Sequence, residues 1–145
     1  MTSWRDTTPR TVQDDLDSLV GPAVDAAEQF LNSRGEFFPF CLTIGPDGEL
    51  GFVHGDPDLG ERPPSQAVLD VLYQGAATQQ DTLRAAAFVA DVRLDGSDAV
   101  RVEMEHRDGG PGLAVLAPYA LRGLVRKRAR FGDLQLAEGT RRIWT

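Results

Sequence analysis

The chain has 145 residues, of which 41% are apolar and 26% are charged, proportions typical of a folded globular protein rather than a disordered one. A domain of this length buries about two thirds of the surface that its unfolded chain exposes, so we expect a single domain over 1–145. The net charge of −7 makes nucleic acid an unlikely main ligand, because phosphate neutralisation by Lys and Arg dominates such binding.

The charge is distributed unevenly along the chain. Residues 1–121 contain 8 basic and 20 acidic residues, a net charge of −12, whereas 122–145 contain 7 basic and 2 acidic residues, a net charge of +5. We therefore predict an acidic body followed by a basic C-terminal segment, 122–145.

The single cysteine, Cys41, excludes an intrachain disulfide, and with only two histidines the chain lacks the spacing of a zinc site. The N-terminal residues are polar, and no apolar run approaches the ~20 residues that span a bilayer. These features predict a cytoplasmic protein with no membrane contact.

The first predicted element is an amphipathic helix over 11–33, because apolar residues recur there at steps of three and four. Gly35 is a natural C-terminal stop for this helix. The Gly21-Pro22 pair interrupts it, so either a kinked helix or two short helices result. Residues 1–10 are predicted to be flexible.

Next come two strands, 37–45 and 50–55, joined by Pro46-Asp47-Gly48. Keeping the apolar side chains together places Leu42 opposite Phe52 and His54 at the edge of the hairpin. An acidic, proline-rich connection over 57–64 follows. Ser65 is then the predicted N-cap of a second helix, which ends near Gln79 or Gln80.

A second hairpin is predicted from strands 85–94 and 99–108. If Phe88, Ala90 and Val92 share an apolar face with Val100, Val102 and Met104, the loop must have an odd number of residues. Of the two such loops, Asp95-Gly96-Ser97 avoids opposing like charges, because it places Asp91 opposite Arg101.

A further, largely apolar strand is predicted over 113–119, ending at Pro118, with an edge strand over 131–136. The fold class is therefore α+β: an N-terminal helix and an antiparallel sheet of about five strands, made of two hairpins plus a further strand. The second helix is inserted between the hairpins.

Five residues are candidates for catalysis: His54, Asp56, Glu103, Glu105 and His106. Each also has a structural interpretation. His54 and Asp56 lie where a strand enters a loop, the two glutamates fit a solvated charge ladder with neighbouring arginines, and His106 fits a hydrogen-bonded boundary position. Cys41 is predicted to be a buried small hydrophobe. No pattern for a metal, a cofactor or a phosphate loop is present.

The candidate binding residues are cations of the basic segment and a nearby tryptophan: Arg126, Lys127, Arg128, Arg130 and Trp144. The basic run suits an acidic partner, but it also suits contacts with the acidic body or a charged edge that discourages aggregation. A terminal tryptophan either fastens a chain end to the core or anchors an interface.

Six short motifs follow one another between Gly35 and Trp144: Phe37-Phe38-Pro39-Phe40, Asp47-Gly48, Pro63-Pro64-Ser65-Gln66, Ala90-Asp91-Val92-Arg93, Glu105-His106-Arg107-Asp108-Gly109 and Phe131-Gly132-Asp133-Leu134. In these motifs the chain resembles a family of small uncharacterised bacterial proteins. The resemblance implies no reaction and no catalytic residue, because the family has no assigned function.

Two classes of function follow from these observations. The favoured one is a non-enzymatic protein-interaction domain, self-associating or of a regulatory or immunity type, because the chain is acidic and poor in catalytic motifs. The alternative is a small enzyme or metabolite-binding domain, which requires His54, His106 and the nearby carboxylates to converge on one pocket.

Overall fold

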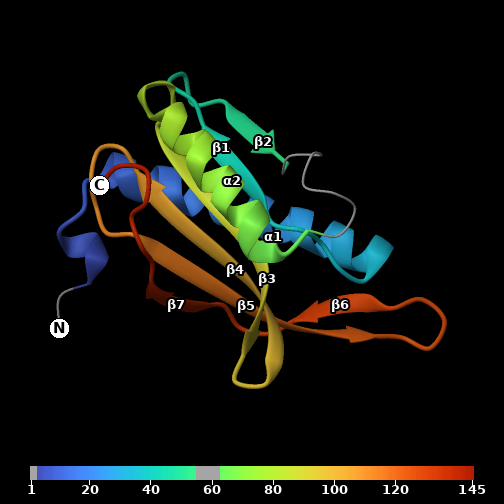
Figure 1. The fold of residues 1–145 in the computed structure, drawn as a ribbon. Helices are drawn as coiled ribbons and strands as arrows, with labels where there is room; N and C mark the ends of the chain where they lie inside the picture. The colour runs from blue at the N-terminus through green and yellow to red at the C-terminus, as the bar shows by residue number, and fades with distance from the viewer. Residues whose placement is uncertain (1–2, 55–62) are drawn as a thin grey trace.

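The computed structural model describes residues 3–54 and 63–145, in which an antiparallel sheet carries a helix on each face (Figure 1). Its elements in chain order are η1 (Trp4–Asp6), α1 (Arg10–Arg34), β1 (Phe40–Ile44), β2 (Leu50–Val53), α2 (Ser65–Thr78), η3 (Gln80–Thr82), β3 (Ala85–Leu94), β4 (Ser97–His106), β5 (Leu113–Arg122), β6 (Arg128–Phe131) and β7 (Gln135–Glu138). The predicted α+β class is confirmed. None of the described helices is long and apolar enough to cross a membrane.

The strand order is β2-β1-β3-β4-β5-β6, and β7 also pairs with β5. The two hairpins, the further strand and the inserted helix are all present as predicted. The C-terminal region contributes two short strands where we expected one edge strand, because β6 pairs with the second half of β5 and β7 with its first half.

Helix α1 is continuous through Pro22, so the possibility of two short helices is not realised. Its core-facing residues are at most 1% exposed, and they form one stripe: Val12, Leu16, Leu19, Ala23, Ala27 and Leu31. The missing amide of Pro22 leaves only the carbonyl of exposed Ser18 without a helical donor, where water is available. Burial of the stripe therefore outweighs the proline. The helix ends as predicted at Gly35, which has φ 77°.

The register of the first hairpin is confirmed, with Leu42 opposite Phe52 and Ile44 opposite Leu50. Gly48 has φ 84° in the turn, and the amide of Gly45 donates to the carbonyl of Glu49 at 2.9 Å. Local turn chemistry and the apolar pattern agree here, so the register follows from both.

Helix α2 begins at Ser65, and the residue at its N-cap position is Pro64, which makes no side-chain capping bond. The assignment of Ser65 as the N-cap is therefore wrong by one position; proline presets the backbone that precedes the helix. Val68, Leu69, Leu72 and Ala76 pack against the sheet, and the helix ends at Thr78, close to the predicted end. Residues 57–62 of the predicted connection lie outside the described residues.

The predicted register of the second hairpin is wrong by one residue. Leu94 pairs with Ser97 across a two-residue turn, so that Ala90, not Asp91, lies opposite Arg101. Both turn residues have positive φ, 50° at Asp95 and 82° at Gly96, as the favoured two-residue hairpin turn requires. The same register brings Arg93 to 2.9 Å from Asp98.

The error came from assuming that the sheet has one apolar face. Residues 85–90 are all buried, because α1 covers the face of Ala85, Ala87 and Val89 while the face of Ala86 and Phe88 packs with α2. An uninterrupted apolar run is the mark of a strand buried on both sides. Phe88 and Val100 accordingly lie on opposite faces, and no odd-numbered loop is needed.

Strand β5 continues through Pro118 to Arg122, so the expected end at Pro118 is also wrong. The carbonyl of Pro118 accepts from Gly132 on the outer side of β5, and the missing amide points to that same side. This position lies between the residues paired with β7 and those paired with β6. The proline therefore removes no hydrogen bond to β4.

Gly96→Ala tests the two-residue turn of the second hairpin, and Gly75→Ala in α2 serves as the comparison. Gly96→Ala should lower the free energy of unfolding by about 1 to 2 kcal/mol, because an L side chain is strained at its positive φ. Gly75 is an exposed position of α2, and no atom outside the helix backbone lies within 4 Å of an added Cβ. Gly75→Ala should therefore raise the free energy of unfolding by up to about 1 kcal/mol. Urea denaturation measures both; a neutral Gly96→Ala would contradict the two-residue turn.

Candidate functional site

The structure does not bring together on one site the four catalytic candidates that it describes. His54 follows β2 at one edge of the sheet, with its ring centroid 4.6 Å from that of Phe52. His106 and Glu105 are neighbours on β4, so their side chains lie on opposite faces of the sheet. Asp56 lies outside the described residues. Within the described parts of the chain, no group of three or more His, Cys, Asp or Glu side chains could hold a metal ion.

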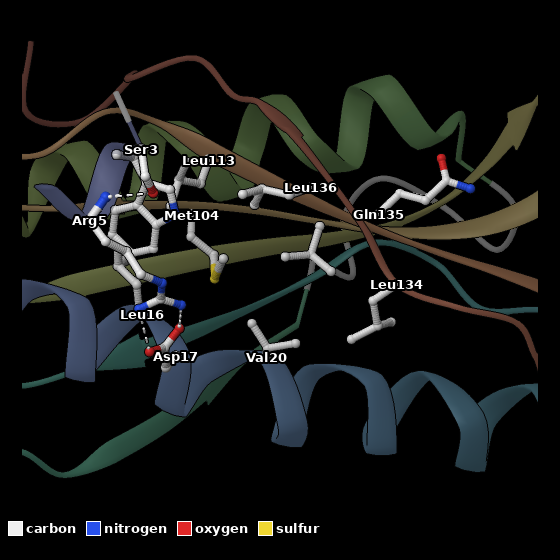
Figure 2. A pocket seen from close by; sticks show the side chains of 12 residues that line it. Ser3, Arg5, Leu16, Asp17, Val20, Met104, Leu113, Leu134, Gln135 and Leu136 are labelled. Atoms are coloured by element: carbon white, nitrogen blue, oxygen red, sulfur yellow. Dashed lines mark hydrogen bonds and ion pairs between the residues drawn. The ribbon is translucent and has the colours of Figure 1, made fainter. Parts of the chain in front are cut away.

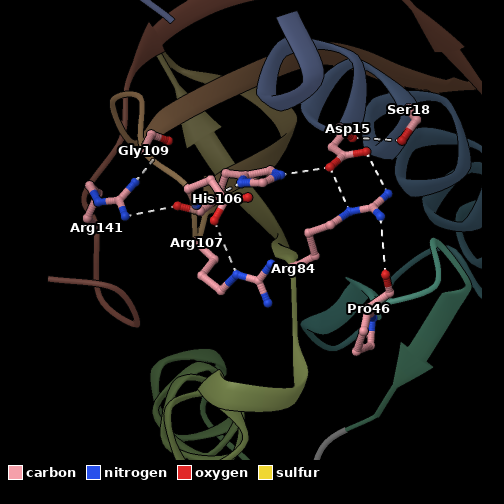
Figure 3. A network of polar contacts seen from close by, with 9 residues as sticks. Asp15, Ser18, Pro46, Arg84, His106, Arg107, Gly109 and Arg141 are labelled. Carbon is pink, nitrogen blue, oxygen red and sulfur yellow. Dashed lines mark hydrogen bonds and ion pairs between the residues drawn. The ribbon is translucent and has the colours of Figure 1, made fainter. Parts of the chain in front are cut away.

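His106 belongs to a buried polar network on the α1 face (Figure 3). Its side chain is 1% exposed, and its Nε2 lies 2.7 Å from Oδ2 of Asp15 on α1. The same carboxylate lies 2.8 Å from Nε of Arg84, whose Nη2 donates to Oδ1 at 2.9 Å. The predicted hydrogen-bonded role of His106 is thus observed, but its partner is 91 residues away in sequence.

The hydrogen bonds of His106 assign its tautomer. Nδ1 accepts from the amide of Asp108 at 3.0 Å, so the ring proton is on Nε2 and is donated to Asp15. Burial alone would raise the pKa of Asp15, but the hydrogen bonds from His106 and Arg84 outweigh burial and hold that pKa below its usual value. The network thus fixes an ionised carboxylate between α1 and the start of β3.

Glu103 and Glu105 are buried rather than part of a solvated charge ladder, with exposed fractions of 7% and 2%. Oε1 of Glu105 accepts from the amides of Ile143 and Trp144, and Oε2 accepts from the amide of Arg142, at 2.8 to 3.0 Å. Glu103 binds the same segment through the amide of Thr140 at 3.2 Å. Both carboxylates are therefore committed to holding the C-terminal segment against the sheet.

Trp144 is held as part of this segment. Its indole Nε1 donates to the carbonyl of Gln80 at 3.3 Å, and its ring packs on the cluster that contains Ile143 and Leu72. Of the two roles considered for a terminal tryptophan, the structure places it in the first, fastening a chain end to the core.

A small cavity of about 210 Å³ lies beside α2, with both Cys41 and His54 in its lining. This proximity was not predicted. The Cys41 side chain is 2% exposed, and burial raises the pKa of its thiol to about 12, although a backbone hydrogen bond partly opposes this. The thiol therefore stays protonated at neutral pH and is not an activated nucleophile. Cys41 is the buried hydrophobe that we predicted.

The basic run forms the end of a projecting hairpin, which we call the basic arm and define as residues 119–131 of β5, β6 and their connection (Figure 1). Its base is anchored on the body: the hydroxyl of Tyr119 donates to Asp91 at 2.8 Å, and the amide of Ala129 donates to Asn32 of α1 at 2.7 Å. The end of the arm, 122–128, is exposed throughout.

Two aliphatic residues, Leu124 and Val125, are completely exposed at the tip of the basic arm, at 105% and 101% of their reference areas. The backbone turns closely at the tip, because a Cβ on Gly123 would meet the carbonyl oxygen of Arg126. Five cations flank the tip: Arg122, Arg126, Lys127, Arg128 and Arg130. None of them has an ion-pair partner among the residues that the structure describes.

An apolar groove of about 400 Å³ lies between α1 and β7 (Figure 2). Its floor is formed by buried Leu16, Met104 and Leu113, while Val20 of α1 and the half-exposed Leu134 and Leu136 form its sides. We call this the β7 groove. Arg5 and Asp17 form an ion pair of 2.8 Å at one end of it. The segment 1–10, which we predicted to be flexible, includes η1. Arg5 of η1 contacts α1 through its ion pair with Asp17.

Comparison of the chain with protein-family models, with curated proteins and with solved structures found no match. The candidate site must therefore be judged from its own chemistry. His106, Glu103 and Glu105 are hydrogen-bonded to other parts of the chain, and His54 lies apart from them at the edge of the sheet. The basic arm exposes apolar side chains and cations, and the β7 groove exposes apolar side chains, that no other described part of the chain covers.

Sequence reasoning missed several of these features. Leu124 and Val125 adjoin the basic run, and two aliphatic residues between arginines were an available signal of an exposed tip. Asp15 and Arg84 gave no such signal, because their contact with His106 joins distant parts of the chain. The β7 groove was equally hidden, since its two sides come from α1 and β7.

The Asp15 network predicts a pH-dependent stability difference. Asp15→Asn should lower the free energy of unfolding at pH 7 by about 2 kcal/mol, because it removes charge-assisted hydrogen bonds. Since the folded pKa of Asp15 is lowered, its contribution is complete above the unfolded value and should be lost as pH falls below ~4. Asp14→Asn, in an exposed pair with Arg10, is the control and should change stability by less than about 0.5 kcal/mol.

The C-terminal segment should loosen when Glu105 loses its charge. We expect Glu105→Gln to lower the free energy of unfolding by about 2 kcal/mol and to speed hydrogen exchange at the amides of Ile143 and Trp144. Glu138→Gln on exposed β7 provides the control. Unchanged exchange at both amides in Glu105→Gln would show that the segment is held by other contacts.

Proposed function

We propose that the protein is a non-enzymatic protein-interaction domain that binds an acidic protein partner through the basic arm. One observation carries this proposal: the arm projects a tip with two fully exposed aliphatic side chains among five cations that form no ion pair with the described residues. Isolated apolar side chains on a surface are common, but a projecting pair surrounded by one sign of charge is the pattern of a contact that gains from both desolvation and steering.

The partner that fits this surface is acidic and offers a small apolar pocket. The flanking arginines supply planar donors suited to carboxylates, and Leu124 and Val125 supply the apolar area. Nucleic acid would also attract the cations, but the acidic body, with its net charge of −12 over 1–121, would repel a long phosphate backbone. A protein that acts by occupying its partner in this way fits a regulatory or immunity-type role.

The enzyme alternative required the candidate residues to share a pocket. Of the candidates that the structure describes, His54 follows the edge strand β2, whereas the other three lie on both faces of the central strand β4, which gives the alternative no support. Glu103, Glu105 and His106 already have hydrogen-bonding partners within the chain. A reducing, cytoplasmic setting is part of the proposal. It is supported by the single cysteine, whose thiol is buried.

The proposal is tested by capturing partners from nuclease-treated lysate of the source organism. The baits are the wild type, an arm variant with Arg126, Lys127, Arg128 and Arg130 changed to Glu, and a control variant with Arg10, Arg34, Arg93 and Arg107 changed to Glu. Both variants change the net charge equally. We expect the arm variant to lose a stoichiometric partner that wild type and control retain.

The captured partner should then bind the purified wild type with an affinity that falls as salt rises, and binding should weaken at least tenfold in Leu124→Ser/Val125→Ser. Equal capture by arm variant and wild type contradicts the proposal. If a partner captured from untreated lysate is lost on nuclease treatment, the result would instead identify a nucleic-acid ligand.

A further inference from the structure

The basic arm cannot reach the β7 groove of its own molecule. Tyr119 and Ala129 fasten the base of the arm to Asp91 and Asn32, and from there the hairpin projects away from β7 (Figure 1). An arm that occupies the groove must therefore belong to another molecule.

The β7 groove matches the tip of the arm in size and chemistry. At ~30 Å³ for each water, its volume of about 400 Å³ corresponds to roughly a dozen water molecules, which is ample for the seven side-chain carbons of Leu124 and Val125. Its lining is mainly aliphatic, with Trp4 at the end where Arg5 pairs with Asp17. Water in such a groove gains few hydrogen bonds, so its displacement by aliphatic groups is favourable.

The charges around the two surfaces are complementary. The arm carries five cations and no acidic residue, whereas the chain segments that border the groove carry Asp133 and Glu138 in addition to the ion pair of Asp17 with Arg5. The body behind them is strongly acidic, so the arm of one copy is attracted to the body of another. No foreign molecule need be invoked to supply the acidic, apolar partner that the arm requires.

We propose that two copies of this chain exchange arms, each inserting Leu124 and Val125 into the β7 groove of the other. The inference rests on the proposed function and names its partner as a second copy. The contact is reciprocal, so a two-fold axis closes the assembly at a dimer. It buries the two fully exposed aliphatic residues of the arm together with Leu134 and Leu136. It also brings the arm cations close to the acidic body of the partner copy, including Asp133 and Glu138.

Complementary variants test the exchange by light scattering over a concentration series at low salt. The arm variant is Leu124→Asp/Val125→Asp, the groove variant is Leu134→Asp/Leu136→Asp, and the control is Leu50→Asp/Val53→Asp on the opposite edge of the sheet. All six substituted residues are at least 46% exposed, so the variants should fold. Wild type and control should dimerise, each remaining variant alone should be monomeric, and their equimolar mixture should recover a heterodimer through its one intact contact.

A second measurement locates the contact. Protein with Val125→Cys mixed with protein carrying Leu136→Cys should form a disulfide-linked heterodimer under mild oxidation at least tenfold faster than Val125→Cys forms a homodimer alone, because the proposed contact places the two introduced thiols side by side. Native Cys41 is buried and should not compete. Dimers that persist in the groove variant, or a mixture that remains monomeric, overturn the exchange.

The outcomes also separate this inference from the proposed function. A wild type that stays monomeric throughout overturns the arm exchange. If the arm variant then still loses a different protein in the capture experiment, the interaction function stands with another partner. If dimerisation is as expected but no captured protein depends on the arm, the arm serves self-association alone and the proposal of a separate partner fails.

Discussion

The centre of the sheet has no face in contact with solvent, and this burial governs the rest of the molecule. Residues 85–90 of β3 are covered by α1 on one side and by α2 on the other. A polar group on the neighbouring β4 must find its partners inside the protein. His106 does so with Asp15 on the α1 face, and Glu105 does so with the C-terminal segment on the opposite face. These contacts tie both ends of the chain to one strand.

The part of the sheet that is buried on both faces ends at β5. Both the basic arm and the β7 groove depend on how this strand is paired. Its first half pairs with β7, beyond the cover of α1, and this leaves the β7 groove between the helix and the edge. Its second half leaves β4 after Pro118 and pairs only with β6, so that the ribbon projects as the basic arm. One change of strand partner therefore creates an exposed apolar tip and an apolar groove in the same molecule.

Local patterns predicted much of this fold. The stripe of α1, its end at Gly35, the first hairpin with its register and the burial of Cys41 all depend on periodicity or on turn residues close in sequence. The second hairpin failed, because its register was chosen on the assumption of a single apolar face. Glu103 and Glu105 were placed in solvent for the same reason. Their alternation with arginine resembles a solvated charge ladder, and no neighbouring residue in the sequence indicates that the C-terminal segment covers them.

The sequence by itself determined the α+β class, the order of most elements, the acidic body and the basic run that becomes the arm. These properties follow from composition and from contacts between residues a few positions apart. Only the tertiary structure decided which faces are buried, which carboxylates are structural and where apolar surface stays open. Asp15 meets His106 across 91 residues and Glu105 meets Ile143 across 38, and no local pattern encodes contacts of that separation, because they depend on how the elements pack.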